Sequence, residues 1–308
     1  MNAGIAGGTL EEWTCEANPE SLTLEKARLL RSAGIDRVSL GAQSFDPAVL
    51  TALGREHAPH HVFRALELLR AAGFARLSLD LMFAAPGESD AQLERDLSTL
   101  TSLDLEHVSA YCLTYEPGTP LTRMRAEGRV MPQTDDVELV QYRLVRERLA
   151  AAGLAHYEIS NYARPGRESR HNLVYWRGEE YYGVGLGAGS YESGTRRTNT
   201  RQLNEYLGDL ARWGSDASGA PARFPPHEAE TLDLVAKSRE ALILGLRLIA
   251  GVDLRHHEQR FGLSIASLYP EGEVESLIRN DLLETSGGWL RLTARGLELA
   301  DEAFIALV

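Results

Sequence analysis

Residues 29–40, LLRSAGIDRVSL, decide the fold, because the stretch recurs at 68–79 as LLRAAGFARLSL and more weakly at 149–159 as LAAAGLAHYEI. Each copy reads as the end of an amphipathic helix, then a glycine, then a strand. Glycine accepts the left-handed backbone that closes a helix without a Cβ clash. The glycines that we expect to end these three helices are Gly34, Gly73 and Gly153. Repeated helix–strand units predict an α/β fold with a parallel sheet.

Working outward from these repeats, hydrophobic alternation predicts five strands, at residues 12–17, 37–40, 76–82, 107–113 and 157–160. Helices are expected at 91–103 and 137–152. A further helix is expected to lead into the second repeat, because Val62, Phe63, Leu66 and Leu69 recur at helical spacing and form one apolar face. A closed barrel of β/α units has eight strands. Five strands therefore predict an open or partial barrel.

The domain organisation follows from a Gly-, Ser-, Ala- and Pro-rich run, GSDASGAPARFPPH, that begins at Gly214. Such a composition is typical of a linker. We expect a barrel domain at 1–213, a linker at 214–228 and a C-terminal domain at 229–308. In the last we expect a long helix at 228–250, a helix with one apolar face, a strand pair at 283–285 and 289–293, and a final helix at 294–307. The apolar face would be formed by Val274, Leu277, Ile278 and Leu282. This order predicts a small winged-helix-like α+β domain.

Composition excludes several classes of protein. The 308 residues are 44% hydrophobic and 25% charged, which is typical of a folded globular chain. A net charge of −12 disfavours nonspecific nucleic-acid binding and binding to anionic membranes. No apolar run is long enough to cross a membrane, and the first ten residues do not read as a secretory signal. The two distant cysteines, Cys15 and Cys112, are typical of reduced thiols, so we expect a cytoplasmic location.

Polar residues stand where the predicted strands end, and in a β/α barrel these ends carry the reactive groups. Glu16 and Asp80 are carboxylates within apolar alternation, and Gln43 lies in a Gly-Ala-Gln turn. Each alone could instead cap a helix or meet solvent. Together they would converge at one end of the sheet, where carboxylate and amide groups hold the ribose and amino-acid groups of a nucleotide-like cofactor.

Five segments carry a family resemblance: CEANPESL from Cys15, RVSLGAQSFDPAVLTALGREH from Arg37, LSLDLMFAAPGES from Leu77, HVSAYCLTYEPGTP from His107 and ISNYARPGRESRHNLVYWRG from Ile159. They resemble the oxygen-independent coproporphyrinogen III oxidase-like branch of the radical S-adenosylmethionine (SAM) proteins. The HNxxYW run resembles, within that branch, the HemW subgroup of haem chaperones. The resemblance implies a partial (β/α) barrel that lacks its first strands and holds SAM in its mouth.

Matched by position, the SAM contacts implied by this resemblance are Glu16, Gln43, Arg55 and Asp80, with Arg55 expected in the helix that follows Gln43. Family members also bind a [4Fe–4S] cluster through CxxxCxxC. That motif is absent here, and two cysteines cannot supply three ligands. We therefore expect no metal ligand and no catalytic residue in this chain, and we expect it to begin about two β/α units later than the family pattern.

The resemblance also implies haem binding by His171, Asn172, Tyr175 and Trp176. His171 could ligate the haem iron, and the two aromatic rings could pack on the porphyrin. The glycine-rich run 183–189 would allow a ligand to approach the backbone, and Arg196 and Arg197 could pair with propionates. Without the family context, aromatic core residues and a solvated histidine would be the preferred explanation of the motif, and the resemblance reverses that preference.

The function implied is that of a haem chaperone that delivers haem to an apo-haemoprotein, with SAM and an iron–sulfur cluster as cofactors in complete members. The first alternative is an oxygen-independent coproporphyrinogen III oxidase, a radical SAM decarboxylase. A degenerate member without a cluster and a winged-helix regulator are the others. An uncovered first strand would also favour a homodimer.

Overall fold

The computed structural model describes residues 10–214 and 228–308, and the chain divides into two compact units, Met1–Arg170 and His171–Val308. Apart from its two end residues, the linker predicted at 214–228 lies outside the described residues.

The first unit is built on one mixed sheet with the strand order β1-β2-β3-β4-β6-β5. Its strands are β1 (Thr14–Ala17), β2 (Arg37–Gln43), β3 (Arg76–Phe83), β4 (His107–Cys112), β5 (Ala155–Glu158) and β6 (Asn161–Ala163). The first four are parallel neighbours, as the repeats predict. The five predicted strands are present, but β6 was missed. It follows β5 after a short turn, which permits only an antiparallel return, and it pairs between β4 and β5.

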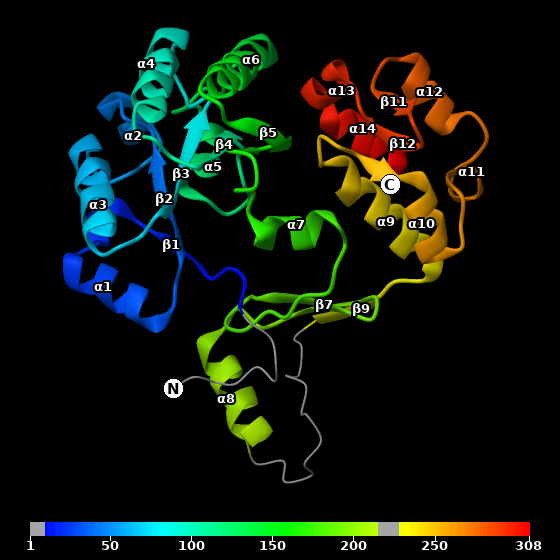
Figure 1. Cartoon of the computed structure of the whole chain (residues 1–308), viewed down its shortest axis with the longest axis horizontal. Coiled ribbons are helices and arrows are strands. Elements are labelled where there is room, and N and C mark those ends of the chain that lie inside the picture. Colours follow the sequence, from blue (N-terminus) through cyan, green and yellow to red (C-terminus); the bar gives the residue numbers. More distant parts are fainter. Residues whose placement is uncertain (1–9, 215–227) are drawn as a thin grey trace. The chain divides into compact units, whose positions relative to one another are not determined.

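One face of this sheet is covered by helices (Figure 1), and the first unit has six α-helices among its described residues. They are α1 (Leu24–Ala33), α2 (Pro47–Ala52), α3 (Pro59–Ala71), α4 (Asp90–Thr101), α5 (Pro120–Ala126) and α6 (Asp135–Ala151), with a short 3-10 turn, η1 (Pro19–Ser21). The sheet's apolar face packs under them, and Val38, Leu40, Leu79, Leu81 and Val108 are fully buried there. This burial is the main stabilising term of the unit.

The glycine prediction is confirmed at all three helix ends, because Gly34, Gly73 and Gly153 have φ values of 104°, 86° and 78°. The predicted apolar face of α3 is correct except at Phe63, which is 38% exposed. Its ring instead stacks on Phe45, with the centroids 5.7 Å apart. The helical period alone cannot tell a core position from one that packs on a neighbouring surface ring.

The second unit begins with α7 (Arg170–Trp176) and continues through the three-stranded sheet β7 (Gly189–Glu192), β8 (Thr195–Thr198) and β9 (Glu228–Thr231), with α8 (Leu203–Gly214) between β8 and β9. The long helix predicted at 228–250 is wrong in its first turns. Residues 228–231 pair with β8 as β9, and α9 (Leu234–Leu246) starts only after Asp233. The Asp233 side chain accepts a hydrogen bond from the Ala236 amide and so caps that helix.

The rest of the second unit contains β10 (Val252–Asp253), α10 (Leu254–Phe261), α11 (Ile265–Leu268), α12 (Glu273–Arg279), β11 (Leu283–Ser286), β12 (Trp289–Leu292), α13 (Ala294–Glu298) and α14 (Ala300–Leu307). The predicted hairpin is confirmed as β11–β12. The final helix is broken at Leu299, whose φ of −124° is not helical. Ile278, expected on the apolar face, is 39% exposed.

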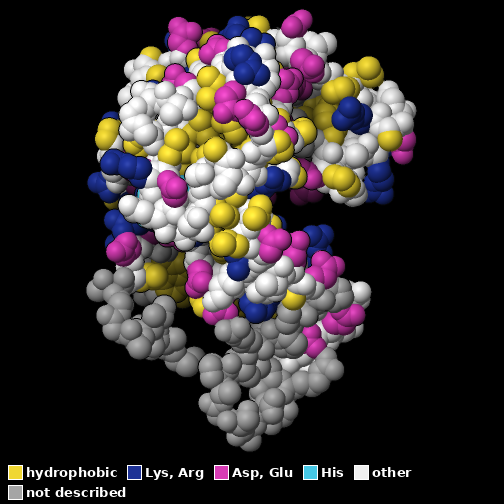
Figure 2. Space-filling model, turned by 90° about the vertical axis from the view of Figure 1, so that its right-hand side faces the viewer, with side chains coloured by type: hydrophobic (Ala, Val, Ile, Leu, Met, Phe, Trp, Pro, Cys, Tyr) yellow, Lys and Arg dark blue, Asp and Glu magenta, His cyan; other side chains and the backbone are white. Residues whose placement is uncertain are grey.

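Charged side chains of both signs are spread over the surface. Figure 2 shows Lys and Arg side chains separated by acidic and neutral ones on the face in view. In the parts of the chain that the structure describes, no helix is both long and apolar enough to cross a membrane.

Candidate functional site

Two polar rows run across the sheet of the first unit, on the face opposite the helices. One row pairs Glu16, Ser39, Ser78 and His107 across β1 to β4. The next row pairs Gly41, Asp80, Ser109 and Asn161 across β2, β3, β4 and β6. Paired residues share a face because side chains alternate along each strand. This polar face is therefore the candidate binding surface of the unit.

Asp80 lies at the centre of these rows, within β3 and not in the loop after it. Its carboxylate accepts a hydrogen bond from Ser39 Oγ at 3.0 Å and another from Ser109. Burial raises the pKa of Asp80 and the nearby Glu16 carboxylate raises it further, although the two serines act in the opposite direction. The structure thus brings Glu16 and Asp80 close enough to interact electrostatically.

Gln43 ends β2 with a left-handed backbone, φ 62°, and is only 8% exposed. Its amide lies above Gly41, where a Cβ would stand 2.9 Å from Gln43 Nε2 and 3.9 Å from Asn18 Oδ1. A Cβ at this position would displace the Gln43 amide from Gly41. Glu16, on the neighbouring strand, is exposed. Three of the predicted SAM contacts therefore belong to this face of the sheet.

Arg55 is not in a helix as expected. It follows α2 in the extended segment before α3 and is exposed. The helix ends early because Gly54 adopts φ 67° directly before Arg55. The nearby His57, which is buried, contacts the Ala42 carbonyl oxygen through Nε2 at 2.9 Å and so holds this segment beside the end of β2.

The sequence reasoning missed Ser39, Ser78, Ser109 and His107. A signal for the three serines was present, since a serine recurs at the third position of RVSL, RLSL and HVSA. His107 is 1% exposed and contacts Ser78 Oγ at 2.8 Å and the Tyr157 hydroxyl at 2.9 Å. Burial lowers the pKa of His107 well below its usual value, so the ring is neutral.

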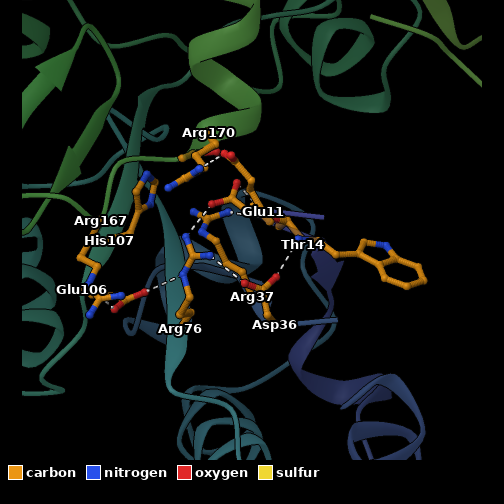
Figure 3. Close-up of polar contacts among 12 residues, drawn as sticks. Glu11, Thr14, Asp36, Arg37, Arg76, Glu106, His107, Arg167 and Arg170 are labelled. Atoms are coloured by element: carbon orange, nitrogen blue, oxygen red, sulfur yellow. Dashed lines mark hydrogen bonds and ion pairs between the residues drawn. The ribbon is translucent and has the colours of Figure 1, made fainter. Parts of the chain in front are cut away.

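An ion-pair cluster occupies the opposite, amino-terminal edge of the sheet (Figure 3). Arg76, at the start of β3, contacts Glu12 at 2.5 Å, Asp36 at 2.8 Å and Glu106 at 3.4 Å. Arg167 also reaches Glu106, at 3.4 Å. These opposite charges compensate one another. They lie at the amino-terminal ends of the strands, and in β/α barrels that end contributes stability, whereas the reactive groups stand at the carboxyl ends. We therefore assign the cluster a structural role.

A buried acid lies behind the carboxyl edge of the sheet, in the loop after β3. Glu88 accepts a hydrogen bond from the Ala85 amide at 3.1 Å, and its Oε1 atom is buried without a hydrogen-bond partner among the described residues. Burial, with the negative charge of Asp96, raises the pKa of Glu88 to about 7. Gln133 and Gln141 donate to the Glu88 carbonyl oxygen and fix the loop.

The cysteines do not fit an iron–sulfur cluster. Cys15 lies in β1 and Cys112 at the end of β4, with two strands between them. Burial raises the pKa of both thiols, that of Cys112 to about 12, which disfavours the thiolate that iron requires. Among the residues described, no group of three potential metal ligands is found.

The HNxxYW residues lie on α7, in the second unit. His171 and Tyr175 are one helical turn apart, with His171 Nε2 and the Tyr175 hydroxyl at 2.9 Å. Tyr175 packs edge-on against Tyr181, with ring centroids 4.6 Å apart. Trp176 lies under the Arg247 guanidinium, 4.3 Å from its ring centroid. Asn172, between these residues, is half-buried.

A cavity of about 310 Å³ opens beside α7. Its walls are Tyr175, Trp176, Gly178, Glu179, Tyr181, Tyr191, Arg196, Lys237, Glu240, Ala241 and Leu244. A second cavity, of about 520 Å³, shares Trp176, Glu179 and Ala241 with it. Both volumes are in the range of small-molecule pockets, roughly 300–1,000 Å³. The structure thus places two of the four predicted haem residues, Tyr175 and Trp176, in one aromatic wall.

Gly183, in the glycine run after α7, is approached closely by backbone of the same run. A Cβ on Gly183 would stand 2.1 Å from the Gly189 carbonyl oxygen, so the close approach is made by the loop's own backbone. Of the two expected propionate partners, Arg196 lines the cavity and pairs with Glu240 at 2.6 Å. Arg197 is not among the lining residues and lies 3.6 Å from Glu192.

Known protein families match two ranges of the chain. Residues 6–100 match the radical SAM superfamily and residues 232–299 match the HemN C-terminal domain. The chain is 36% identical to the heme chaperone HemW of Bacillus subtilis, over 97% of this chain and 76% of that protein. It is 40% identical to the heme chaperone HemW of Mycobacterium tuberculosis, over 94% of this chain and 70% of that protein.

Among solved structures, the chain is similar to the coproporphyrinogen III oxidase HemN of Escherichia coli, described as a radical SAM enzyme. The TM-score is 0.78 at 19% sequence identity, over 96% of this chain and 69% of that one. At this identity the likeness shows a shared fold and carries no conclusion about activity.

Proposed function

The chain belongs to the HemW family of heme chaperones within the radical SAM superfamily, and from this premise we propose that it binds haem beside α7 and passes it to an apo-haemoprotein. The observation that carries the proposal is the cavity whose aromatic wall includes Tyr175 and Trp176 of the HNxxYW run.

The lining of this cavity suits a porphyrin. The rings of Tyr175, Trp176, Tyr181 and Tyr191 offer flat apolar surface for a planar macrocycle. Arg196 and Lys237 provide cationic groups in the same wall, and propionate carboxylates are held by such groups. Because Glu240 already pairs with Arg196 at 2.6 Å, a propionate would compete with it, which favours a releasable cargo over a permanent one.

For the first unit we propose SAM binding on the polar face of the sheet. Asp80 and Glu16 offer carboxylates to ribose hydroxyls or an ammonium group, and the Gln43 amide lies at the edge where the strands end. In radical SAM proteins SAM supplies a radical precursor once a cluster reduces it. The two cysteines of this chain do not fit such a cluster.

We also propose a reducing, cytoplasmic location, because both cysteines are free. Homodimerisation through the edge of β1 is expected to give twice the monomer mass in light scattering, and a monodisperse monomer would contradict it.

Titration of the purified chain with ferric haem, followed by its Soret absorption, tests the main proposal. We expect saturable binding, transfer of haem to an added apo-haemoprotein, and roughly tenfold weaker binding in Tyr181→Ala. Trp13→Ala is the matched control, because Trp13 is an exposed aromatic residue of the first unit. No saturable binding in the wild type, or equal weakening in both variants, would contradict the proposal. Decarboxylation of coproporphyrinogen III would favour the oxidase alternative.

A further inference from the structure

The two members of the HNxxYW run that can bind iron differ in their relation to the cavity. Tyr175 lines it, whereas His171 is not among the lining residues and is exposed on α7. The His171 nitrogen that could reach iron, Nε2, instead lies 2.9 Å from the Tyr175 hydroxyl. The Tyr175 phenol therefore lies within hydrogen-bond reach of an imidazole, and of these two residues Tyr175 is the one that belongs to the cavity wall.

We propose that Tyr175 is the axial ligand of ferric haem in this cavity and that His171 accepts the proton of its hydroxyl. The inference rests on the proposed haem binding and deepens it, because it assigns the iron-binding atom. It differs from the expectation that His171 itself ligates iron.

The proton balance of the step is simple. When ferric haem enters, the O–H bond breaks, the proton moves to His171 Nε2, and the phenolate oxygen bonds to iron. No electron is transferred, and no other reactant is needed. Tyrosinate is an established axial ligand of haem iron.

The neighbouring rings favour this geometry. Tyr175 is held edge-on between the His171 imidazole, at 4.9 Å, and the Tyr181 ring, at 4.6 Å. A ligand oriented by a hydrogen-bonding partner behind it is a recurring arrangement in metal sites. The step is also reversible, because return of the proton from His171 restores a neutral phenol, which is a weak ligand. Such a ligand suits a protein that must release its haem.

The test uses the full chain titrated with ferric protoporphyrin IX and read by visible absorption and resonance Raman spectroscopy. We expect a tyrosinate-to-iron charge-transfer band in the wild type and its loss in Tyr175→Phe. Because Phe keeps the ring and its edge contacts, this variant changes only the hydroxyl. Tyr181→Phe, which removes another hydroxyl from the same wall, is the matched control and keeps the band.

His171→Ala separates the two roles. If His171 only accepts the proton, the band persists and haem binds about tenfold more weakly. If Tyr175→Phe keeps the wild-type spectrum while His171→Ala loses axial ligation, His171 is the ligand and the inference is wrong, although haem binding stands. If the wild type binds no haem, the proposed function itself fails.

Discussion

The polar face of the first sheet and the aromatic wall of α7 are built in opposite ways. On the sheet, Asp80 lies between two serines that hydrogen-bond its carboxylate, on strands whose other face is fully buried. At α7, the half-exposed ring of Tyr175 contacts that of Tyr181, and Trp176 Nε1 is buried without a hydrogen-bond partner among the described residues.

This difference shows how each region could treat a ligand. A surface whose groups are held by several partners across four strands is preorganised and changes little when a cofactor binds. The two rings that α7 gives to the cavity wall, Tyr175 and Trp176, stand on a seven-residue helix with fewer such constraints, so this part of the wall can accept a ligand and release it. The first region suits a resident cofactor and the second a cargo. The following predictions test that contrast, in order of decreasing effect.

The largest effect is expected at the ion-pair cluster of the first unit. Arg76→Met leaves Glu12, Asp36 and Glu106 without their shared cation, and we expect a loss of about 3 kcal/mol in the free energy of unfolding. Haem affinity should not change. Arg95→Met is the control, because the Arg95 side chain is exposed and its pair with Asp46 contributes less than about 1 kcal/mol. Denaturant unfolding measures both, and equal losses would contradict the structural role of Arg76.

A pH effect is expected from Glu88. Because its pKa rises from 4.5 to about 7 on folding, the folded state binds the proton more tightly than the unfolded chain. The free energy of unfolding should therefore fall as pH rises from about 4.5 to about 7, by up to about 3 kcal/mol. Glu88→Gln keeps an acceptor for the Ala85 amide and removes this dependence. An unchanged pH profile in the variant would assign the effect to other groups.

Smaller effects are expected at Asp80, where one substitution should raise stability and weaken SAM binding. Burial favours its protonated form, so at neutral pH the ionised carboxylate lowers stability. Asp80→Asn should raise the melting temperature and weaken SAM binding roughly tenfold, through one lost charge-assisted hydrogen bond. Calorimetric titration with SAM measures the binding. A variant that is more stable and binds SAM as well as the wild type would remove Asp80 from the site.

The smallest effect is expected beside α7. Arg247→Leu removes the cation above the Trp176 ring, and we expect a loss of about 1 kcal/mol in the free energy of unfolding. Thermal unfolding monitored by circular dichroism measures this change. If the loss equalled that of Arg76→Met, the α7 region would be as firmly held as the first sheet, and the contrast between the two regions would fail.

The sequence predicted the fold better than the site. Gly34, Gly73 and Gly153 were found because a left-handed helix end restricts the residue locally. The strand β6 was missed because three residues after a turn carry too little periodicity to be recognised. At the site, Glu16 and Asp80 stood out as charges in apolar alternation, whereas the serines of the same rows did not, since serine is common at exposed strand positions.

The sequence by itself determined the repeated helix–strand order, the absence of a three-cysteine motif and the HNxxYW run, because each is a property of spacing along the chain. Only the tertiary structure decided which polar residues share a face of the sheet and that Tyr175, not His171, lines the cavity. Strand register and side-chain direction depend on partners distant in the sequence, so local patterns cannot fix them.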